Sequence, residues 1–203
     1  TSGKLKVEEA GGYQSDFPMD AMMQIAAALE KKSEHPLAEA VVEWAEQFGL
    51  AIPEIVDFKA TFGRGVEGTL AAEFRAVESV KNDGPTVVFY AGKQNDTTDG
   101  SGKTTEQNQM ARNTVSGASS VIIPAGTKFY VGNLAFLQEN HITLPEEATE
   151  GLNRMADEGM TPLLVAQEGR FLGVIGVADT VKATSYEAIR VWEKMGVKVI
   201  MLT

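Results

Sequence analysis

The stretch Glu30-Lys31-Lys32-Ser33-Glu34-His35-Pro36-Leu37-Ala38 joins two segments whose apolar residues recur at helical spacing. The first segment, Phe17 to Lys32, predicts a packed helix. Pro36 suits the first position of a second helix, which should stop at Gly49. His35 then falls at the N-cap of that second helix. The stretch therefore predicts two packed helices joined by a short turn, and the rest of the fold is built around them.

Short strands with glycine-containing turns are predicted on the C-terminal side of these helices. Gly63-Arg64-Gly65 reads as a hairpin turn, and Asn133 as the N-cap of a short helix through Gln138. Gly92 to Gly117 is rich in polar and small residues and is predicted to be mobile. The predicted strands are Leu5 to Glu8, Ile55 to Phe62, Val66 to Phe74, Thr86 to Ala91, Ser120 to Ile123, Lys128 to Val131, Leu163 to Ala166 and Phe171 to Val177, and a further helix is predicted for Pro145 to Glu158.

The pattern changes near the C-terminus. Ala183 to Met195 is amphipathic, Gly196 stops it, and Val197 to Leu202 is a continuous apolar strand typical of a parallel α/β unit. We therefore expect an α+β fold, an antiparallel sheet flanked by helices, with a partial α/β piece at the C-terminus. Because the chain begins without Met and stops directly after an apolar strand, we interpret it as a fragment of a larger protein.

Composition excludes several classes of function. The formal net charge of −10 over 203 residues weighs against nucleic acid as the main partner, which requires clustered Lys and Arg. The absence of cysteine excludes disulfides and thiolate metal sites, and two histidines are too few to support a metal site. No apolar run approaches the roughly 20 residues of a membrane-spanning helix. We expect a soluble, monomeric chain without a metal site of its own.

Three local patterns could carry chemistry: Glu30 with Ser33-Glu34-His35-Pro36, the run Gly63-x-Gly65-Val66-x-Gly68, and the pair Gly132-Asn133. Each has a structural explanation when taken alone. A histidine at an N-cap usually caps or packs, and a glycine triplet between strands is usually a hairpin device. The triplet also precedes a strand, whereas a dinucleotide-binding fingerprint opens a helix, so the Rossmann interpretation fails.

Taken together and in this order, the three patterns resemble the nucleotide-binding domain of heavy-metal-transporting (type IB) P-type ATPases, in particular copper exporters. The resemblance implies that ATP is the ligand, with Mg²⁺ in the intact enzyme, and that no residue of this chain is a catalytic group. It implies that His35 lies against the adenine ring and Glu30 at the adenine edge. The remaining site residues implied by the family are Gly63, Gly65 and Val66, where the backbone approaches the nucleotide, and Gly132 and Asn133, which close the pocket.

The chemistry of these side chains agrees with that assignment. An imidazole offers a purine a stacking face, a carboxylate such as Glu30 can accept a hydrogen bond from the adenine amino group, and glycines allow close approach of a ligand. The resemblance implies that the triphosphate of bound ATP points out of the pocket, so a domain with a net negative charge can still bind ATP.

The flanks extend the resemblance to the family's phosphorylation domain. Thr1 to Leu5 resembles the continuation of Asp-Lys-Thr-Gly-Thr-Leu-Thr, whose Asp is phosphorylated, and Ala178 to Lys182 resembles the second hinge. Met195 to Thr203 resembles the run that ends in the Thr of Thr-Gly-Asp, so Thr203 would contact the transferring phosphoryl group. The implied division is residues 1–5 as a remnant of the phosphorylation domain and first hinge, residues 6–178 as the nucleotide-binding domain with an insert at about 75–124, and residues 179–203 as the second hinge and partial phosphorylation domain.

The resemblance implies a parent protein that is an ATP-driven cation translocase of the membrane, with this chain as a cytoplasmic domain and the phosphorylation, actuator and transmembrane domains as its partners. The phosphorylated Asp is missing, so the chain should bind ATP without hydrolysing it. Two other interpretations stay open. A phosphohydrolase of the haloacid dehalogenase type would need an Asp-x-Asp motif that the sequence lacks, and a nonenzymatic interaction module would use the polar stretch Gly92 to Gly117.

Overall fold

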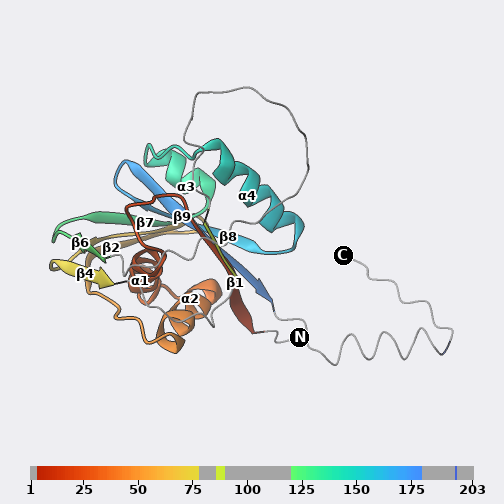
Figure 1. Cartoon of the computed structure of the whole chain (residues 1–203), viewed down its shortest axis with the longest axis horizontal. Helices are drawn as coiled ribbons and strands as arrows, with labels where there is room; N and C mark the ends of the chain where they lie inside the picture. The colour runs from red at the N-terminus through yellow and green to blue at the C-terminus, as the bar shows by residue number, and fades with distance from the viewer. Residues whose placement is uncertain (1–3, 78–85, 90–119, 180–194, 196–203) are drawn as a thin grey trace, which may run out of the picture.

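The computed structural model describes residues 4–77, 86–89, 120–179 and 195, and its centre is a seven-stranded sheet (Figure 1). Every neighbouring pair of strands in this sheet is antiparallel except the edge pair β1 and β5, which is parallel. The predicted antiparallel sheet flanked by helices is therefore confirmed, with one parallel edge that the sequence did not predict. The strand order is β2 (Ile55–Thr61), β3 (Gly65–Leu70), β7 (Lys128–Gly132), β8 (Thr161–Gln167), β9 (Arg170–Asp179), β1 (Leu5–Gly12) and β5 (Thr86–Phe89).

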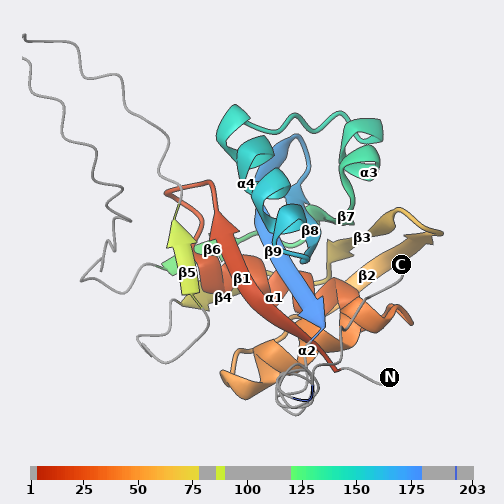
Figure 2. The same ribbon diagram turned by 90° about the vertical axis from the view of Figure 1, so that its right-hand side faces the viewer.

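Helices cover both faces of the sheet. The helices α1 (Met19–Glu30) and α2 (Pro36–Gln47) lie on one face, and α3 (Leu134–Glu139) and α4 (Glu146–Asp157) lie on the other, as Figures 1 and 2 both show. Side chains alternate between the two faces along each strand. In β8, Leu163 therefore joins the core under α1, whereas its neighbour Leu164 joins the core under α4.

The helix α1 is buried on nearly all sides, and its path across the sheet places the candidate site. Its residues are buried from Met19 to Glu30 with the exception of Asp20. A Cβ atom added at Gly173 of β9 would lie 2.5 Å from the Met22 sulfur, and one added at Gly68 of β3 would lie 3.0 Å from Leu29 Cδ2. The helix thus crosses from β9 to β3, and its C-terminal end lies against the β2–β3 hairpin.

The predicted strand from Val66 to Phe74 is confirmed at its start and wrong at its end, because the chain leaves the sheet after Leu70. The strand β3 ends at Leu70, whose backbone is held by the N–H of Gly126 and the carbonyl of Thr127. A new strand, β4 (Phe74–Val77), then pairs with β6 (Ser120–Ile123) in a separate two-stranded sheet. These two strands form the base of the predicted insert.

The other predicted elements are confirmed, most of them to within two residues at each end. The exception is the predicted strand Leu5 to Glu8, which continues to Gly12 because β1 pairs along its length with β9. The predicted mobile stretch Gly92 to Gly117, the C-terminal helix and strand, Lys182 and Thr203 lie outside the described residues, apart from an exposed Met195. Among the helices that the structure describes, none has the length and apolar character needed to cross a bilayer.

Candidate functional site

The turn between α1 and α2 fixes His35 at the start of α2, as predicted. The Nδ1 atom of His35 accepts a hydrogen bond from the backbone N–H of Leu37 at 3.2 Å, and the His35 N–H donates to Ser33 Oγ at 3.3 Å. Because Nδ1 acts as the acceptor of the helix cap, the proton of the neutral ring sits on Nε2. His35 is an exposed residue, and the hydrogen bond at Nδ1 orients its imidazole at the start of α2.

Glu30 is the last residue of α1 and is a buried acid, with 5% of its surface exposed. Burial raises the pKa of its carboxyl to about 7, and a hydrogen bond with the Ser33 side chain opposes part of that rise. Near neutral pH the carboxyl is therefore present in both its protonated and its ionised form. It can act as a hydrogen-bond donor or as an acceptor toward a ligand.

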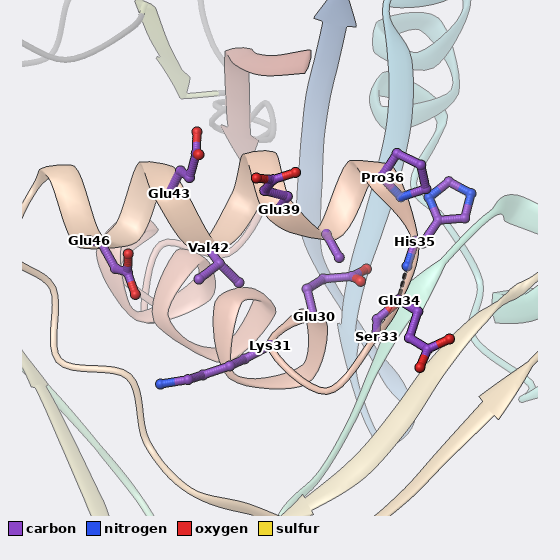
Figure 3. Close-up of a pocket in the computed structure, with 11 residues that line it drawn as sticks. Glu30, Lys31, Ser33, Glu34, His35, Pro36, Glu39, Val42, Glu43 and Glu46 are labelled. Atoms are coloured by element: carbon purple, nitrogen blue, oxygen red, sulfur yellow. Dashed lines mark hydrogen bonds between the residues drawn. The ribbon is translucent and has the colours of Figure 1, made fainter. Parts of the chain in front are cut away.

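Glu30 and His35 line the same open groove, which has a volume of about 600 Å³. Figure 3 shows the Glu30 carboxyl pointing toward the first turn of α2 and the His35 ring beside Pro36. The rest of the groove follows one face of α2 and is acidic, because it includes Glu39, Glu43 and Glu46. Like charges repel, so the phosphates of a nucleotide would be disfavoured along that face of α2.

A second group of predicted residues meets where β3 begins and β7 ends, and we call Gly63, Gly65, Gly132 and Asn133 the glycine corner. Gly65 lies opposite Gly132 in the strand register. The backbone N–H of Asn133 donates to the Arg64 carbonyl at 2.8 Å, and its Nδ2 donates to the Gly63 carbonyl at 3.1 Å. The Asn133 Oδ1 accepts from the N–H of Phe136 at 3.0 Å and caps α3. The structure thus brings these four residues together.

The glycines of this corner are also required by the packing of the protein itself. A Cβ atom at Gly65 would lie 2.3 Å from the Val131 carbonyl oxygen and 2.7 Å from the Phe136 ring, and one at Gly132 would lie 2.5 Å from the Arg64 carbonyl oxygen. Gly63 has φ +67°, a left-handed conformation that suits glycine at the hairpin turn. Their sequence pattern therefore has a structural explanation that does not involve a ligand.

Val66, the remaining predicted site residue, is 5% exposed and packs in the core under α1. The two groups of residues are connected through α1, because Leu29 packs on Gly68 and the Lys32 ammonium donates to the Ile55 carbonyl. Gly68 is three residues from Gly65, which is about 10 Å along a strand. The C-terminal end of α1, which carries Glu30, and the glycine corner thus both lie along β3, and the described lining of the groove does not include the corner.

Three residues next to the predicted site make contacts that the sequence did not predict: Ser33, Arg64 and Glu139. Ser33 contacts both Glu30 and His35. The guanidinium of Arg64 forms an ion pair with the Glu139 carboxylate at the end of α3. The position of Arg64 between two glycines was a usable signal, whereas nothing in the sequence distinguishes Glu139. The described residues contain no group of three His, Asp or Glu side chains that could hold a metal ion.

Comparison with known proteins gives the family. A family model described as haloacid dehalogenase-like hydrolase matches residues 6–203, nearly the whole chain. The chain belongs to the haloacid dehalogenase-like hydrolase family. The chain is 28% identical over 184 residues, 91% of its length, to a copper-exporting P-type ATPase of Staphylococcus aureus (strain MRSA252). The chain spans only 16% of that relative's length.

Solved structures show the same fold for this haloacid dehalogenase-like chain. One crystal structure of a zinc-transporting PIB-type ATPase superimposes with a TM-score of 0.61 and 23% identity, covering all of this chain and 24% of that one. A second crystal structure of a zinc-transporting PIB-type ATPase, in a different state, gives a TM-score of 0.59 and 22% identity, covering 98% of this chain and 23% of that one. Together with the copper-exporting relative, these matches confirm the predicted resemblance to the heavy-metal class of P-type ATPases.

Proposed function

We propose that this chain is the ATP-binding domain of a heavy-metal-exporting P-type ATPase. The observation that carries the proposal is the α1–α2 turn, which fixes an exposed imidazole and a buried carboxyl in one groove. His35 stacks on the adenine ring; the helix cap at its Nδ1 and the exposure of the residue support this role. Glu30 recognises the adenine edge by hydrogen bonding.

In this proposal the sugar and phosphates leave the acidic face of α2 and pass toward the glycine corner. Gly63, Gly65, Gly132 and Asn133 present a backbone surface there, with Val66 packed beneath it. Residues 6–178 form the nucleotide-binding domain, and residues 1–5 and 179–203 belong to the hinges and the phosphorylation domain. Asp179, which is exposed at the end of β9, belongs to the second hinge. The γ-phosphate, accompanied by Mg²⁺, is delivered to an Asp outside this chain.

We propose copper as the exported ion, because the curated relatives that match are named copper-exporting P-type ATPases. The solved structures with a similar fold are named zinc-transporting, so the fold of this chain does not discriminate between the two metals. A stand-alone phosphohydrolase is the second candidate, favoured by the description of the matching family as hydrolases.

The test is a calorimetric titration of ATP and of AMP into this chain and into His35→Asn. Asparagine retains a side-chain oxygen for the cap of α2 and removes only the aromatic ring. We expect both nucleotides to bind the parent chain and to bind the variant about tenfold more weakly or worse, because stacking on an aromatic ring is worth about 1–3 kcal/mol.

The matched control is His141→Asn. His141 lies beyond the end of α3 with φ +59°, a conformation that asparagine tolerates. This variant should bind ATP like the parent chain. If the parent chain binds neither nucleotide, or if both histidine variants weaken binding equally, the proposed adenine site is wrong.

A further inference from the structure

Arg64 is the basic residue of the glycine corner. Residues 61–66 and 131–139, which build the hairpin tip, the end of β7 and α3, contain one arginine and no lysine. The Arg64 side chain is 43% exposed and pairs with Glu139, whose side chain is 55% exposed. This ion pair links the tip of the β2–β3 hairpin to the last residue of α3 on the surface beside the corner.

The surroundings give an anionic ligand few alternatives to this arginine. The chain carries a formal charge of −10, and the groove that holds Glu30 and His35 is bordered by further glutamates along α2. Lys31 lines the groove but extends away from both residues (Figure 3). The Lys32 ammonium is engaged by the Ile55 carbonyl. On the β2–β3 hairpin the exposed cations are Lys59, which lies opposite Glu67 in the strand register, and Arg64, which is the one at the tip beside the glycine corner.

We propose that Arg64 is a phosphate-contacting residue of the nucleotide site and that Glu139 is its counter-ion until ATP replaces it. The inference rests on the proposed function and deepens it. The planar guanidinium can donate two parallel hydrogen bonds to a phosphate. An ion pair as exposed as Arg64 with Glu139 contributes little to stability in water, so exchanging the carboxylate for a more highly charged phosphate is favourable.

The backbone at this position is held independently of the side chain. The Arg64 carbonyl accepts from the Asn133 N–H at 2.8 Å, and the Gly63 carbonyl accepts from Asn133 Nδ2 at 3.1 Å. The Arg64 side chain can therefore change partners while the hairpin tip keeps its place beside β7. Glu139 acts on ATP only through Arg64 and is a positioning residue in this scheme.

The experiment measures the affinities of adenosine, AMP, ADP and ATP for the parent chain, Arg64→Gln, Glu139→Gln and the control Arg75→Gln, which removes an exposed arginine of β4. Adenosine should bind all four proteins equally, because it has no phosphate. The ratio of ATP to adenosine affinity should fall about tenfold in Arg64→Gln. In Glu139→Gln, where the competing carboxylate is gone, the ratio should rise about two- to fivefold.

The outcomes separate this inference from the function on which it rests. If adenosine and ATP both fail to bind the parent chain, the proposed function is wrong and this inference falls with it. If adenosine binds but the ATP-to-adenosine ratio of Arg64→Gln equals that of the parent chain, the adenine site stands and the role of Arg64 is overturned. Thermal unfolding of each variant checks its fold. If Arg64→Gln does not fold, an unchanged ratio of ATP to adenosine affinity in Glu139→Gln still overturns the proposal that ATP replaces Glu139 at Arg64.

Discussion

The buried carboxyl of Glu30 links the stability of the domain to pH. Its pKa is about 7 in the folded chain because of burial, against an ordinary value of 4.5. Between these values the folded state keeps a proton that the unfolded state has lost. The contribution of Glu30 to stability is therefore fully present below about pH 4.5 and is lost as the pH rises through about 7. A shift of this size corresponds to about 3 kcal/mol.

We predict that Glu30→Gln, which cannot ionise, gains about 3 kcal/mol of unfolding free energy relative to the parent chain between about pH 4 and about pH 8. Urea unfolding of both proteins at the two pH values measures this difference. Glu34→Gln is the control, because Glu34 lies four residues further along the same turn and is exposed. An equal change for both variants would mean that the pKa of Glu30 is not raised in the folded chain.

The glycines of the corner should differ in their sensitivity to substitution. Gly65→Ala and Gly132→Ala each place a methyl group against a carbonyl oxygen and the Phe136 ring, and should cost about 2–4 kcal/mol. Gly63→Ala places a methyl group where no atom lies within 4 Å, so only its left-handed φ of +67° is unfavourable, by about 1–2 kcal/mol. Urea unfolding gives all three values. A cost at Gly63 equal to that at Gly65 would contradict the packing argument.

Among the elements, α4 is attached to the sheet by an ion pair as well as by its apolar face. Arg154 of α4 donates two hydrogen bonds to Glu9 of β1, one of them at 3.0 Å, and the Glu9 side chain is only 9% exposed. Arg154→Leu would leave that carboxylate buried without its guanidinium. We predict a loss of about 2–3 kcal/mol, below the usual cost for a fully buried pair because Arg154 itself is 39% exposed.

The control for this prediction is Arg170→Leu. Arg170 contacts Asp16, whose side chain is 68% exposed, so its loss should cost about 1 kcal/mol or less. Thermal or urea unfolding compares the two variants. Equal losses would show that the burial of Glu9 does not set the strength of the α4 attachment.

The elements that the sequence predicts well are those defined by local signals. The boundaries of α1 and α2 follow from apolar periodicity, Pro36 and the His35 cap, all of which act within one or two turns. The end of β3 was missed because it depends on two hydrogen bonds with residues distant in the sequence: the Leu70 N–H donates to the Thr127 carbonyl, and the Gly126 N–H donates to the Leu70 carbonyl. The parallel pairing of β5 with β1 was missed for the same reason.

In the candidate site, too, the features set by local sequence signals were predicted and those set by contacts between distant residues were not. Glu30 and His35 belong to one short motif, so their shared groove could be anticipated. The family resemblance assigned Gly65 to ligand approach and Gly132 to closing the pocket, whereas the contacts with the Phe136 ring that require both glycines arise only when β3, β7 and α3 pack together. The partner of Arg64 could not be predicted, because α3 places Glu139 beside the hairpin only in the folded chain.

For the molecule as a whole, we predict that ATP stabilises the chain without being consumed. A ligand at about 100 times its dissociation constant adds about 2.7 kcal/mol to the unfolding free energy. For a chain of this size that raises the Tm by about 5–10 °C. The shift should shrink in His35→Asn and persist in His141→Asn, as measured by differential scanning fluorimetry.

The same samples should release no phosphate above the uncatalysed rate. Phosphoryl transfer in a P-type ATPase needs an Asp nucleophile, and the 203 residues contain neither Asp-Lys-Thr-Gly nor Asp-x-Asp. Phosphate release from ATP and from p-nitrophenyl phosphate tests this directly. Turnover of p-nitrophenyl phosphate without a Tm shift by ATP would favour a stand-alone phosphohydrolase, because such an enzyme acts on the phosphate and does not need an adenine-reading groove at Glu30 and His35.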